Sequence, residues 1–432
     1  MRKQKSVRLN YLMNCILTAS SMIFPLLSYP YVSRILQPDG MGKVAFANSI
    51  VSYFAMVAML GIPTYGIRAC AKVRDDKEQL SQLVWELLIL NFVTTLITCA
   101  LFGFCIVLVP RFAQDKLLFV LMGSSMFFQM LGVEWLFRAL EEYSYITIRS
   151  LIFKIIALCM MFLFIADGED YIIYGVLTVA AGVGSNLCNF FRLHRIVNPL
   201  KRPIKPILKV AIEKHLKGVG IFFAMAAAAT IYTNLDIAML GFMSGDIEAG
   251  YYSSAVKIKG VLVSFVTALG GVLLPRLSYY IEQKNMEAFD RMVKKAFLFV
   301  TLLSIPLTIF FIWFAKYSIL ILAGEAFLPA VKPMQIIIPT LILIGFSNIC
   351  GIQILVPLNQ EKHVFYSELL GAVIDILINI WLIPTMGATG AAIGTLVAEA
   401  VVLLYQVVVL MYMRKNRKFK EIDYDTRENQ TI

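Results

Sequence analysis

The sequence has 432 residues, of which 59% are hydrophobic and only 16% are charged. An ordinary soluble domain is about 45–50% apolar, so this composition excludes soluble, disordered and fibrous proteins and predicts a multi-pass membrane protein. The formal net charge of +11 reflects membrane topology, as the distribution of basic residues below indicates, and we expect no nucleic-acid binding.

A helix that crosses a membrane needs about 20 predominantly apolar residues. The first candidate follows the basic residues 1–5 and is too long for a signal peptide, so we expect it to remain as a signal anchor. The apolar runs predict twelve spans in chain order: 9–32, 44–66, 80–109, 116–137, 148–166, 171–191, 218–242, 251–275, 295–315, 333–358, 364–383 and 388–412.

Lysine and arginine residues give the orientation of these spans. With the N-terminus inside, 30 of them lie on the inner side, 6 on the outer side and 3 within spans. Cytoplasmic loops carry the excess of basic residues. Both termini are therefore predicted to be cytoplasmic, which agrees with an even number of spans.

The inner loop at about 192–217 is the longest and carries eight basic residues. It divides the spans into six and six, a common plan among transporters. We predict four segments: an N-terminal lobe at 1–197, a basic cytoplasmic linker at 198–217, a C-terminal lobe at 218–413 and a basic cytoplasmic tail at 414–432.

Motifs for cofactors and catalysis are absent from the sequence. The seven cysteines include no C-x-x-C pair, and His194, His215 and His363 lie in predicted cytoplasmic segments without metal-ligand spacing. There is no Walker loop, dinucleotide glycine fingerprint or G-x-S-x-G elbow. We therefore expect no cofactor, no metal site and no catalytic activity.

Six ionisable side chains are predicted to lie well inside spans, towards the middle of the membrane, where an ionised group costs roughly 2.5–3.5 kcal/mol on insertion scales. Such groups must line a wet interior, pair with one another, or do both. They are Lys154, Asp236, Lys257, Lys259, Asp375 and Glu399.

Asp236 and Lys257 are predicted to lie at matching depths, each about 9 Å from the outer ends of neighbouring antiparallel spans. They form either a static bridge or part of a cargo site. Lys259 is about 200° further around its helix, so it serves a second helix contact or the cavity rim. Asp375 and Glu399 lie near mid-span on the last two helices, and they either share a proton or cation or bond separately to neighbours such as Asn379.

Further basic residues suggest a cationic interior in the N-terminal half. Arg34, Arg68 and Lys154 lack an obvious acidic partner at the same depth, so they either snorkel towards water or face a shared cavity. Arginine binds phosphate through a planar donor fork, which would suit a diphosphate. Elsewhere, Glu134 and Arg138 are expected to form an i,i+4 ion pair, and the G-x-x-x-G pattern at 390–394 predicts close helix packing.

Seven segments, in the same order along the chain, resemble those of a transporter family. They are YPYVSRILQPDGMGKVAFANSIVSYF (29–54), LGIPTYGIRACAKVRDD (60–76), EWLFRALEEYSYITIRS (134–150), TNLDIAMLGFMSGDIEAGYYSSAVKIKG (233–260), LLPRLS (273–278), LAGEAFLPA (322–330) and MGATGAAIGTLVAE (386–399). This set is similar to the Wzx-type oligosaccharide flippases, the polysaccharide-transport branch of the multidrug/oligosaccharidyl-lipid/polysaccharide (MOP) exporter superfamily.

The resemblance implies an all-α protein of twelve transmembrane helices, in two six-helix lobes around a central cavity. It implies transfer of undecaprenyl-diphosphate-linked oligosaccharide across the bacterial cytoplasmic membrane, with a polysaccharide polymerase and chain-length machinery as partners. The chain stops after twelve predicted spans, without the extra pair of the lipid II flippase branch, which disfavours a peptidoglycan precursor as cargo. Together with the charge pattern, it predicts a cationic cavity built from Arg34, Arg68, Lys154, Lys257 and Lys259.

Two other functions are consistent with a membrane protein of this size. An ion-coupled multidrug or cation exporter of the same superfamily would use Asp236, Asp375 and Glu399 as its principal site, whereas in a flippase these acids serve ion coupling or structure. A membrane glycan polymerase or glycosyltransferase would need a large outer loop with acidic or histidine catalysts. The longest outer loop, about 316–332, contains no histidine.

Overall fold

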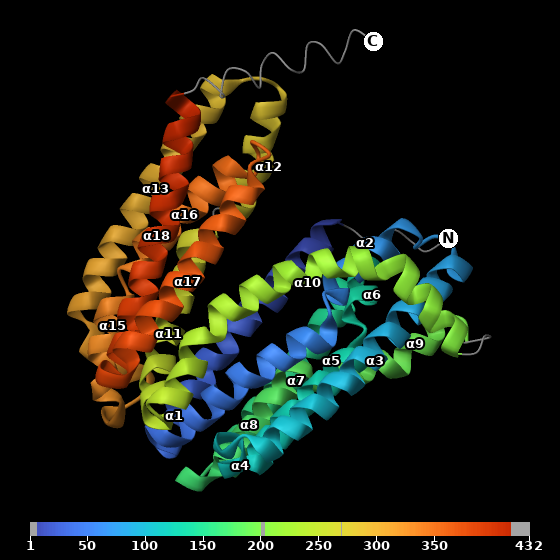
Figure 1. The fold of residues 1–432 in the computed structure, drawn as a ribbon, viewed down its shortest axis with the longest axis horizontal. Helices are drawn as coiled ribbons and strands as arrows, with labels where there is room; N and C mark the ends of the chain where they lie inside the picture. Colours follow the sequence, from blue (N-terminus) through green and yellow to red (C-terminus); the bar gives the residue numbers. More distant parts are fainter. Residues whose placement is uncertain (1–6, 200–203, 269, 416–432) are drawn as a thin grey trace. The chain divides into compact units, whose positions relative to one another are not determined.

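The computed structural model describes residues 7–199, 204–268 and 270–415. Every regular element in these ranges is helical (Figure 1), which confirms the predicted all-α class. The elements are α1 (Val7–Met59), α2 (Ile62–Lys72), α3 (Lys77–Leu108), α4 (Pro110–Gln114), α5 (Lys116–Gly132), α6 (Glu134–Ala139), α7 (Tyr143–Phe164), η1 (Gly168–Asp170), α8 (Tyr171–Val179), η2 (Ala180–Gly184), α9 (Asn186–Ile196), α10 (Ile204–Met243), α11 (Asp246–Thr267), α12 (Gly270–Glu282), α13 (Met286–Trp313), α14 (Ala315–Leu322), η3 (Glu325–Ala330), α15 (Val331–Ile337), α16 (Thr340–Asn348), η4 (Ile349–Leu355), α17 (Glu361–Met386) and α18 (Ala388–Lys415).

Nine helical stretches in the described ranges are long and apolar enough to cross a membrane, or ten if the pair at Glu325–Ile337 and Thr340–Leu355, bent by 42°, forms one span. The predicted number of twelve therefore stays a prediction. The bent pair corresponds to the predicted span 333–358, and two further differences separate ten from twelve. The stretch Arg8–Lys72 contains two predicted spans, and α11 is less apolar because it carries Lys257 and Lys259.

Helix α1 is not a single straight rod. Its backbone leaves the helical region at Gln37, where φ is 58° and ψ is 178°, so two helical segments meet at this residue. Prolines at positions 25, 30 and 38 flank the break, and each removes a backbone donor that a continuous helix would use. The first two predicted spans, 9–32 and 44–66, lie on either side of it.

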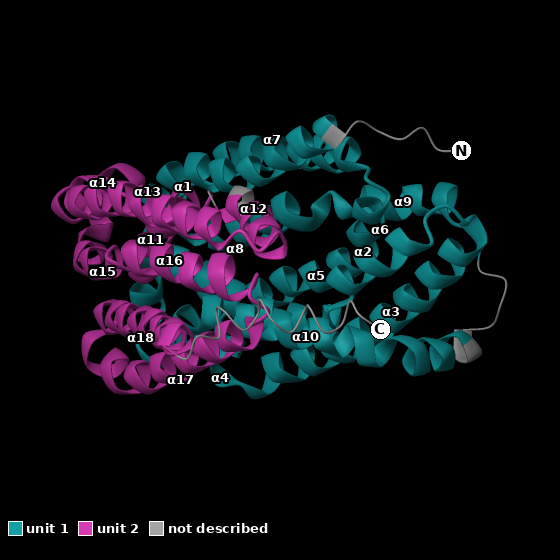
Figure 2. Ribbon diagram, turned by 90° about the horizontal axis from the view of Figure 1, so that it is seen from above, with its two compact units in different colours: residues 1–250 teal, residues 251–432 magenta. Residues whose placement is uncertain are grey.

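The chain divides into two compact units, residues 1–250 and 251–432 (Figure 2). In the first unit, α10 packs against α1 and α3, and α1 also contacts α5 and α7. In the second, the most extensive packing joins α17 to α18. The lobes predicted from the linker at 198–217 remain a prediction, and α10 already begins at Ile204, within that linker. Most of the predicted tail, residues 416–432, lies outside the described residues.

Helix α10 has 40 residues and is about 60 Å long at 1.5 Å per residue. This is twice the roughly 30 Å thickness of a bilayer's hydrocarbon core, so α10 is long enough to extend beyond the core even when it is tilted. The start of α3 is held by Asp76, whose side chain accepts hydrogen bonds from the amides of Glu78 and Gln79. These bonds, chiefly the one from Gln79, lower the pKa of the Asp76 carboxyl.

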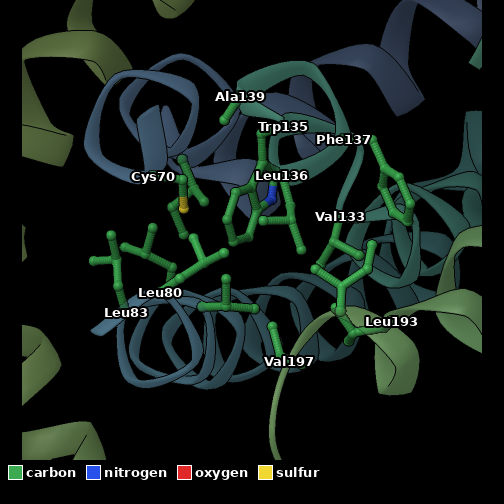
Figure 3. Packing of buried hydrophobic residues seen from close by; sticks show 14 of the residues in the cluster. Cys70, Leu80, Leu83, Val133, Trp135, Leu136, Phe137, Ala139, Leu193 and Val197 are labelled. Carbon is green, nitrogen blue, oxygen red and sulfur yellow. The ribbon is translucent and has the colours of Figure 1, made fainter. Parts of the chain in front are cut away.

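A buried hydrophobic cluster joins six helices in the first unit, α2, α3, α6, α7, α9 and α10. It includes Cys70 from α2, Leu80 and Leu83 from α3, residues 135–137 from α6, Leu193 from α9, and Ala211 from α10. Figure 3 shows many of these side chains gathered around Trp135. A Cβ atom added at Gly66 would lie 2.7 Å from the Trp135 ring. The ends of α2, α3 and α10 are thereby fixed relative to one another, and they bound the cavity described next.

Candidate functional site: a basic cavity in the first unit

A cavity of about 500 Å³ lies between α2, α3 and α10, entirely within the first unit. We call it the basic cavity, because three of its side chains are lysine or arginine and no aspartate or glutamate is among the described residues that line it. The lining residues are Tyr65, Arg68, Ala69, Lys72, Val73, Gln79, Gln82, Leu83, Lys214, His215, Gly218, Ile221 and Phe222.

Two glycines allow α10 to lie against α2 at this site. A Cβ atom at Gly218 would lie 2.7 Å from the Tyr65 ring, and one at Gly61 would overlap the backbone of Phe223. Gly61 also has a φ of 72°, a conformation that glycine adopts without steric cost. Any larger residue at these positions would separate the two helices and disturb the cavity wall.

A hydrogen-bonded chain runs from two residues of the cavity wall, Tyr65 and His215, to Glu86 behind it, and joins the three helices. The Tyr65 hydroxyl is 2.7 Å from His215 Nδ1, and His215 Nε2 is 2.8 Å from Glu86 Oε2. Only 2% of the His215 and Glu86 side chains is exposed. With Glu86 ionised, His215 donates from Nε2 and accepts from Tyr65 at Nδ1, so a neutral imidazole satisfies both contacts.

Glu86 has two further partners. Gln82 donates to Oε1 at 2.8 Å, and the Lys214 ammonium lies 3.2 Å from Oε2. Its charge is thus already balanced by Lys214. No ion pair or side-chain hydrogen bond forms at Arg68 or Lys72 within the described ranges. Both side chains are exposed, so the cavity keeps an excess of positive charge that is available to an anion.

The structure places Arg68 in this cavity, but not the other predicted cations of the first unit. Arg34 is exposed, and its guanidinium donates to the carbonyl of Pro30, one turn earlier in α1. Lys154 is buried in α7, with 8% exposure. Its ammonium donates to the hydroxyls of Ser20 at 2.9 Å and Ser21 at 2.8 Å. Arg34, Arg68 and Lys154 are therefore not brought together around one described pocket.

Lys257 and Lys259 are half-buried on α11 in the second unit. Asp236 is half-buried on α10 in the first unit, so its predicted pairing with Lys257 involves residues of both units and stays a prediction. Asp375 on α17 and Glu399 on α18 are buried, at 4% and 5% exposure. A Cβ atom at Gly394 would lie 2.9 Å from Asp375 Oδ1 and would overlap Asn379 Oδ1, so both oxygens face α18 at this glycine.

Glu86 and His215 were not identified from the sequence. Glu86 lies inside the predicted span 80–109. Because an ionised side chain is energetically unfavourable in lipid, its position there was the signal that could have identified it as a functional candidate. Its partner is 129 residues away, and no spacing rule predicts that contact. No described group of three or more histidine, cysteine, aspartate or glutamate side chains is placed to hold a metal ion.

The family model described as "Polysaccharide biosynthesis protein" matches residues 7–281, well over half of the chain. The chain belongs to this family. A second model, MatE, matches residues 221–381. The family assignment agrees with the resemblance to Wzx-type flippases seen in the sequence and confirms it.

Relatives with assigned names cover almost the whole chain. It is 23% identical over 418 residues to a protein of Escherichia coli K12 named "Putative O-antigen transporter", covering 95% of this chain and 98% of that one. A protein of Shigella dysenteriae with the same name is 24% identical and covers 92% of this chain and 98% of its own length.

Solved structures confirm the fold. The lipid II flippase MurJ in an inward closed conformation aligns with a TM-score of 0.75 at 14% identity, covering 93% of this chain and 87% of MurJ. An inward-facing multidrug-resistance MATE transporter of the MOP superfamily aligns with a TM-score of 0.65 at 12% identity, covering 91% and 95%. The chain is thus a multi-pass, all-α membrane protein with a MATE/MOP-like fold.

Proposed function

We propose that this protein is a flippase for undecaprenyl-diphosphate-linked oligosaccharide repeat units. It would carry them from the inner to the outer leaflet of the bacterial cytoplasmic membrane, with both of its own termini in the cytoplasm. Family membership and the two relatives named as O-antigen transporters support polysaccharide export. The MurJ-like fold supports movement of a lipid-linked substrate.

The observation that carries this proposal concerns three basic groups in apolar helices, Lys154, Arg68 and Lys72, which form no ion pair with a carboxylate among the described residues. Lys154 is buried, and in the described ranges it contacts serine hydroxyls alone, while Arg68 and Lys72 face an acid-free cavity. Because an uncompensated cation is costly in a membrane, its retention favours a role with an anion. We assign Arg34, Arg68, Lys154, Lys257 and Lys259 as contacts for the diphosphate and for acidic sugars.

The proposed mechanism is alternating access, in which the lipid tail stays in the bilayer while the glycan passes through the protein. Asp236, Asp375 and Glu399 serve ion coupling or structural roles in this scheme. A membrane potential supplies roughly 2.3 kcal/mol per charge per 100 mV, which can drive net transfer of an anion outwards. No covalent step is needed, so the protein acts as a transporter and not as an enzyme, next to a polysaccharide polymerase and chain-length machinery.

The test is charge reversal at two proposed contacts, Arg34→Glu and Lys257→Glu, in the organism that encodes the chain. Both variants should insert normally, and surface glycan, measured by immunoblot, should fall by at least about tenfold, because each reversal replaces attraction for a phosphate with repulsion. Lys316→Glu, at an exposed position on α14, is the matched control. Full export by both test variants would refute the assigned contacts.

An ion-coupled multidrug or cation exporter is the second candidate, favoured by the match of the MatE model to residues 221–381. That segment contains two of the three candidate acids, Asp236 and Asp375. A deletion strain distinguishes the two functions. Loss of surface glycan with unchanged drug susceptibility supports the flippase, whereas increased drug susceptibility with normal glycan supports the exporter.

A further inference from the structure

The basic cavity has a polar end and an apolar end. Arg68 and Lys72 lie in the last two turns of α2, where the candidate span Arg8–Lys72 ends, and Lys214 lies near the start of the candidate span Ile207–Met243. Seven residues further along α10, about 10 Å deeper, Ile221 and Phe222 line the same cavity. This polarity matches the boundary between lipid headgroups and acyl chains.

The charge at the polar end is positive. Lys214 is held by Glu86, whose carboxylate sits behind the wall and also bonds to His215. Arg68 and Lys72 add two positive charges, and no carboxylate lines the cavity among the described residues. Arginine offers a donor fork and lysine a compact charge, and both are characteristic of phosphate sites.

We propose that the basic cavity binds the phosphate group of an anionic membrane lipid, such as a phosphatidylglycerol-type lipid. The phosphate contacts Arg68 and Lys72, and one acyl chain lies along Ile221 and Phe222. Basic pockets between transmembrane helices on the cytoplasmic side characteristically receive anionic headgroups. The ligand of this site is a resident phospholipid and not the carried glycan, so the site goes beyond the proposed flippase function. Arg68 is also one of the proposed cargo contacts, so the two proposals overlap at this residue.

A lipid fits the cavity better than a soluble anion does. Inorganic phosphate or pyrophosphate would leave the Ile221 and Phe222 end in contact with water, so it would gain nothing from burial of that apolar surface. Lys214, one turn before Gly218, is paired with Glu86, which leaves Arg68 and Lys72 as the two cations available to a ligand.

Native mass spectrometry of the purified full-length protein tests the proposal directly. Short-chain phosphatidylglycerol is titrated into the detergent-solubilised protein, with phosphatidylcholine of the same chain length as the zwitterionic comparison. We expect preferential binding of phosphatidylglycerol and no displacement by millimolar inorganic pyrophosphate. Equal binding of the two lipids, or displacement by pyrophosphate, would overturn the assignment to an anionic lipid.

Two substitutions, Arg68→Gln and Lys72→Gln, test whether the lipid binds in the basic cavity. Each should weaken phosphatidylglycerol binding about fivefold, since a basic residue near a membrane surface contributes about 1 kcal/mol. Lys209→Gln is the matched control, because Lys209 lies on α10 with 78% of its side chain exposed and does not line the cavity. Equal losses in all three variants would place binding on the general basic surface and refute the site.

This binding experiment is independent of transport. It uses no glycan, and neither Arg34 nor Lys257 is altered. If phosphatidylglycerol binds as expected while the charge reversals leave export intact, the lipid site stands and the cargo contacts fail. If the reversals abolish export but Arg68→Gln and Lys72→Gln leave lipid binding unchanged, the lipid site alone is refuted.

Discussion

The Arg149 guanidinium is buried, with 4% of its side chain exposed, and it lies among three oxygen acceptors. It donates to the Ser185 carbonyl at 2.8 Å, to Asn186 Oδ1 at 3.2 Å and to Glu134 Oε2 at 3.2 Å. Glu134 also forms the predicted i,i+4 pair with Arg138, at 2.7 Å, which confirms that prediction. Arg149 therefore joins α6, α7 and the start of α9.

Replacing Arg149 by leucine should destabilise the protein. Removal of a buried donor leaves its acceptors unsatisfied, at about 1–3 kcal/mol for each acceptor that stays buried. Here the Ser185 carbonyl, the Asn186 oxygen and half of the Glu134 carboxylate lose their donor. We expect the Tm of the detergent-solubilised protein, followed by intrinsic fluorescence, to fall by about 5 °C or more.

Arg138→Leu is the control for this change. Arg138 contacts only Glu134 within the described ranges, and 39% of its side chain is exposed, so its pair should contribute less than about 1 kcal/mol. A fall in Tm as large as that of Arg149→Leu would mean that charge loss near Glu134, and not burial of the guanidinium, determines stability here.

The sequence identified charged residues that are unfavourable within their own apolar segment. It did not identify residues whose role depends on contacts with distant parts of the chain. Lys154 and Asp375 stand out because each is a charge inside an apolar run. Arg149 lies at the edge of a span, where a basic residue is ordinary, and its acceptor at Ser185 is 36 residues away. His215 lies within a basic segment predicted as linker, so its burial against Glu86 was not predictable.

At the scale of elements, α17 and α18 form a closely packed hairpin in the second unit. The G-x-x-x-G pattern at 390–394 predicted close packing, and the structure confirms it. A Cβ atom at Gly390 would lie 2.7 Å from the Leu382 backbone, and one at Gly394 would meet the oxygens of Asn379 and Asp375. The hairpin thus brings two buried polar side chains against a helix backbone.

Gly394→Val should force these helices apart. Added volume in a packed interface costs typically 1–3 kcal/mol, and here it also displaces two buried polar groups whose contacts are expensive to lose. We expect a clear reduction in the yield of monodisperse protein in fluorescence-detected gel filtration, and a lower Tm in the fraction that remains.

Gly260→Ala gives the matched comparison on another helix of the second unit. A Cβ atom at Gly260 meets nothing within 4 Å, and alanine favours a helix interior over glycine by roughly 0.5–1 kcal/mol. This variant should be at least as stable as the parent protein. If Gly394→Val behaves in the same way, the α17–α18 contact does not limit stability.

Hydropathy predicted where apolar helices lie but not how they bend or where they stop at polar ends. The break at Gln37 depends on φ and ψ at one residue, which a sliding average over many residues cannot detect. Likewise α10 begins at Ile204, within the segment predicted as a linker because of its basic residues. Its packing against α2 and α3 is a tertiary contact that composition does not predict.

At the scale of the whole molecule, the number of membrane crossings depends mainly on the first 72 residues. The stretch Arg8–Lys72 has 65 residues and would measure about 98 Å as one helix, three times the hydrocarbon thickness. The break at Gln37 allows two crossings of ordinary length instead. The predicted spans place 30 lysine and arginine residues inside and 6 outside, and this assignment predicts a turn outside the membrane near Asp39.

Reporter fusions to truncated chains test this topology. Alkaline phosphatase, which is active only outside the cytoplasm, should be active when fused after Gly40 or Glu325. Green fluorescent protein, which folds in the cytoplasm, should fluoresce after Asp76, after Lys209 and at the C-terminus. These results follow from the positive-inside rule applied to twelve spans. The fusion after Gly40 decides the first crossing: an inactive phosphatase there, together with fluorescence of green fluorescent protein fused at the same residue, would mean that residues 8–72 do not turn outside, and the predicted even count would lose its first pair.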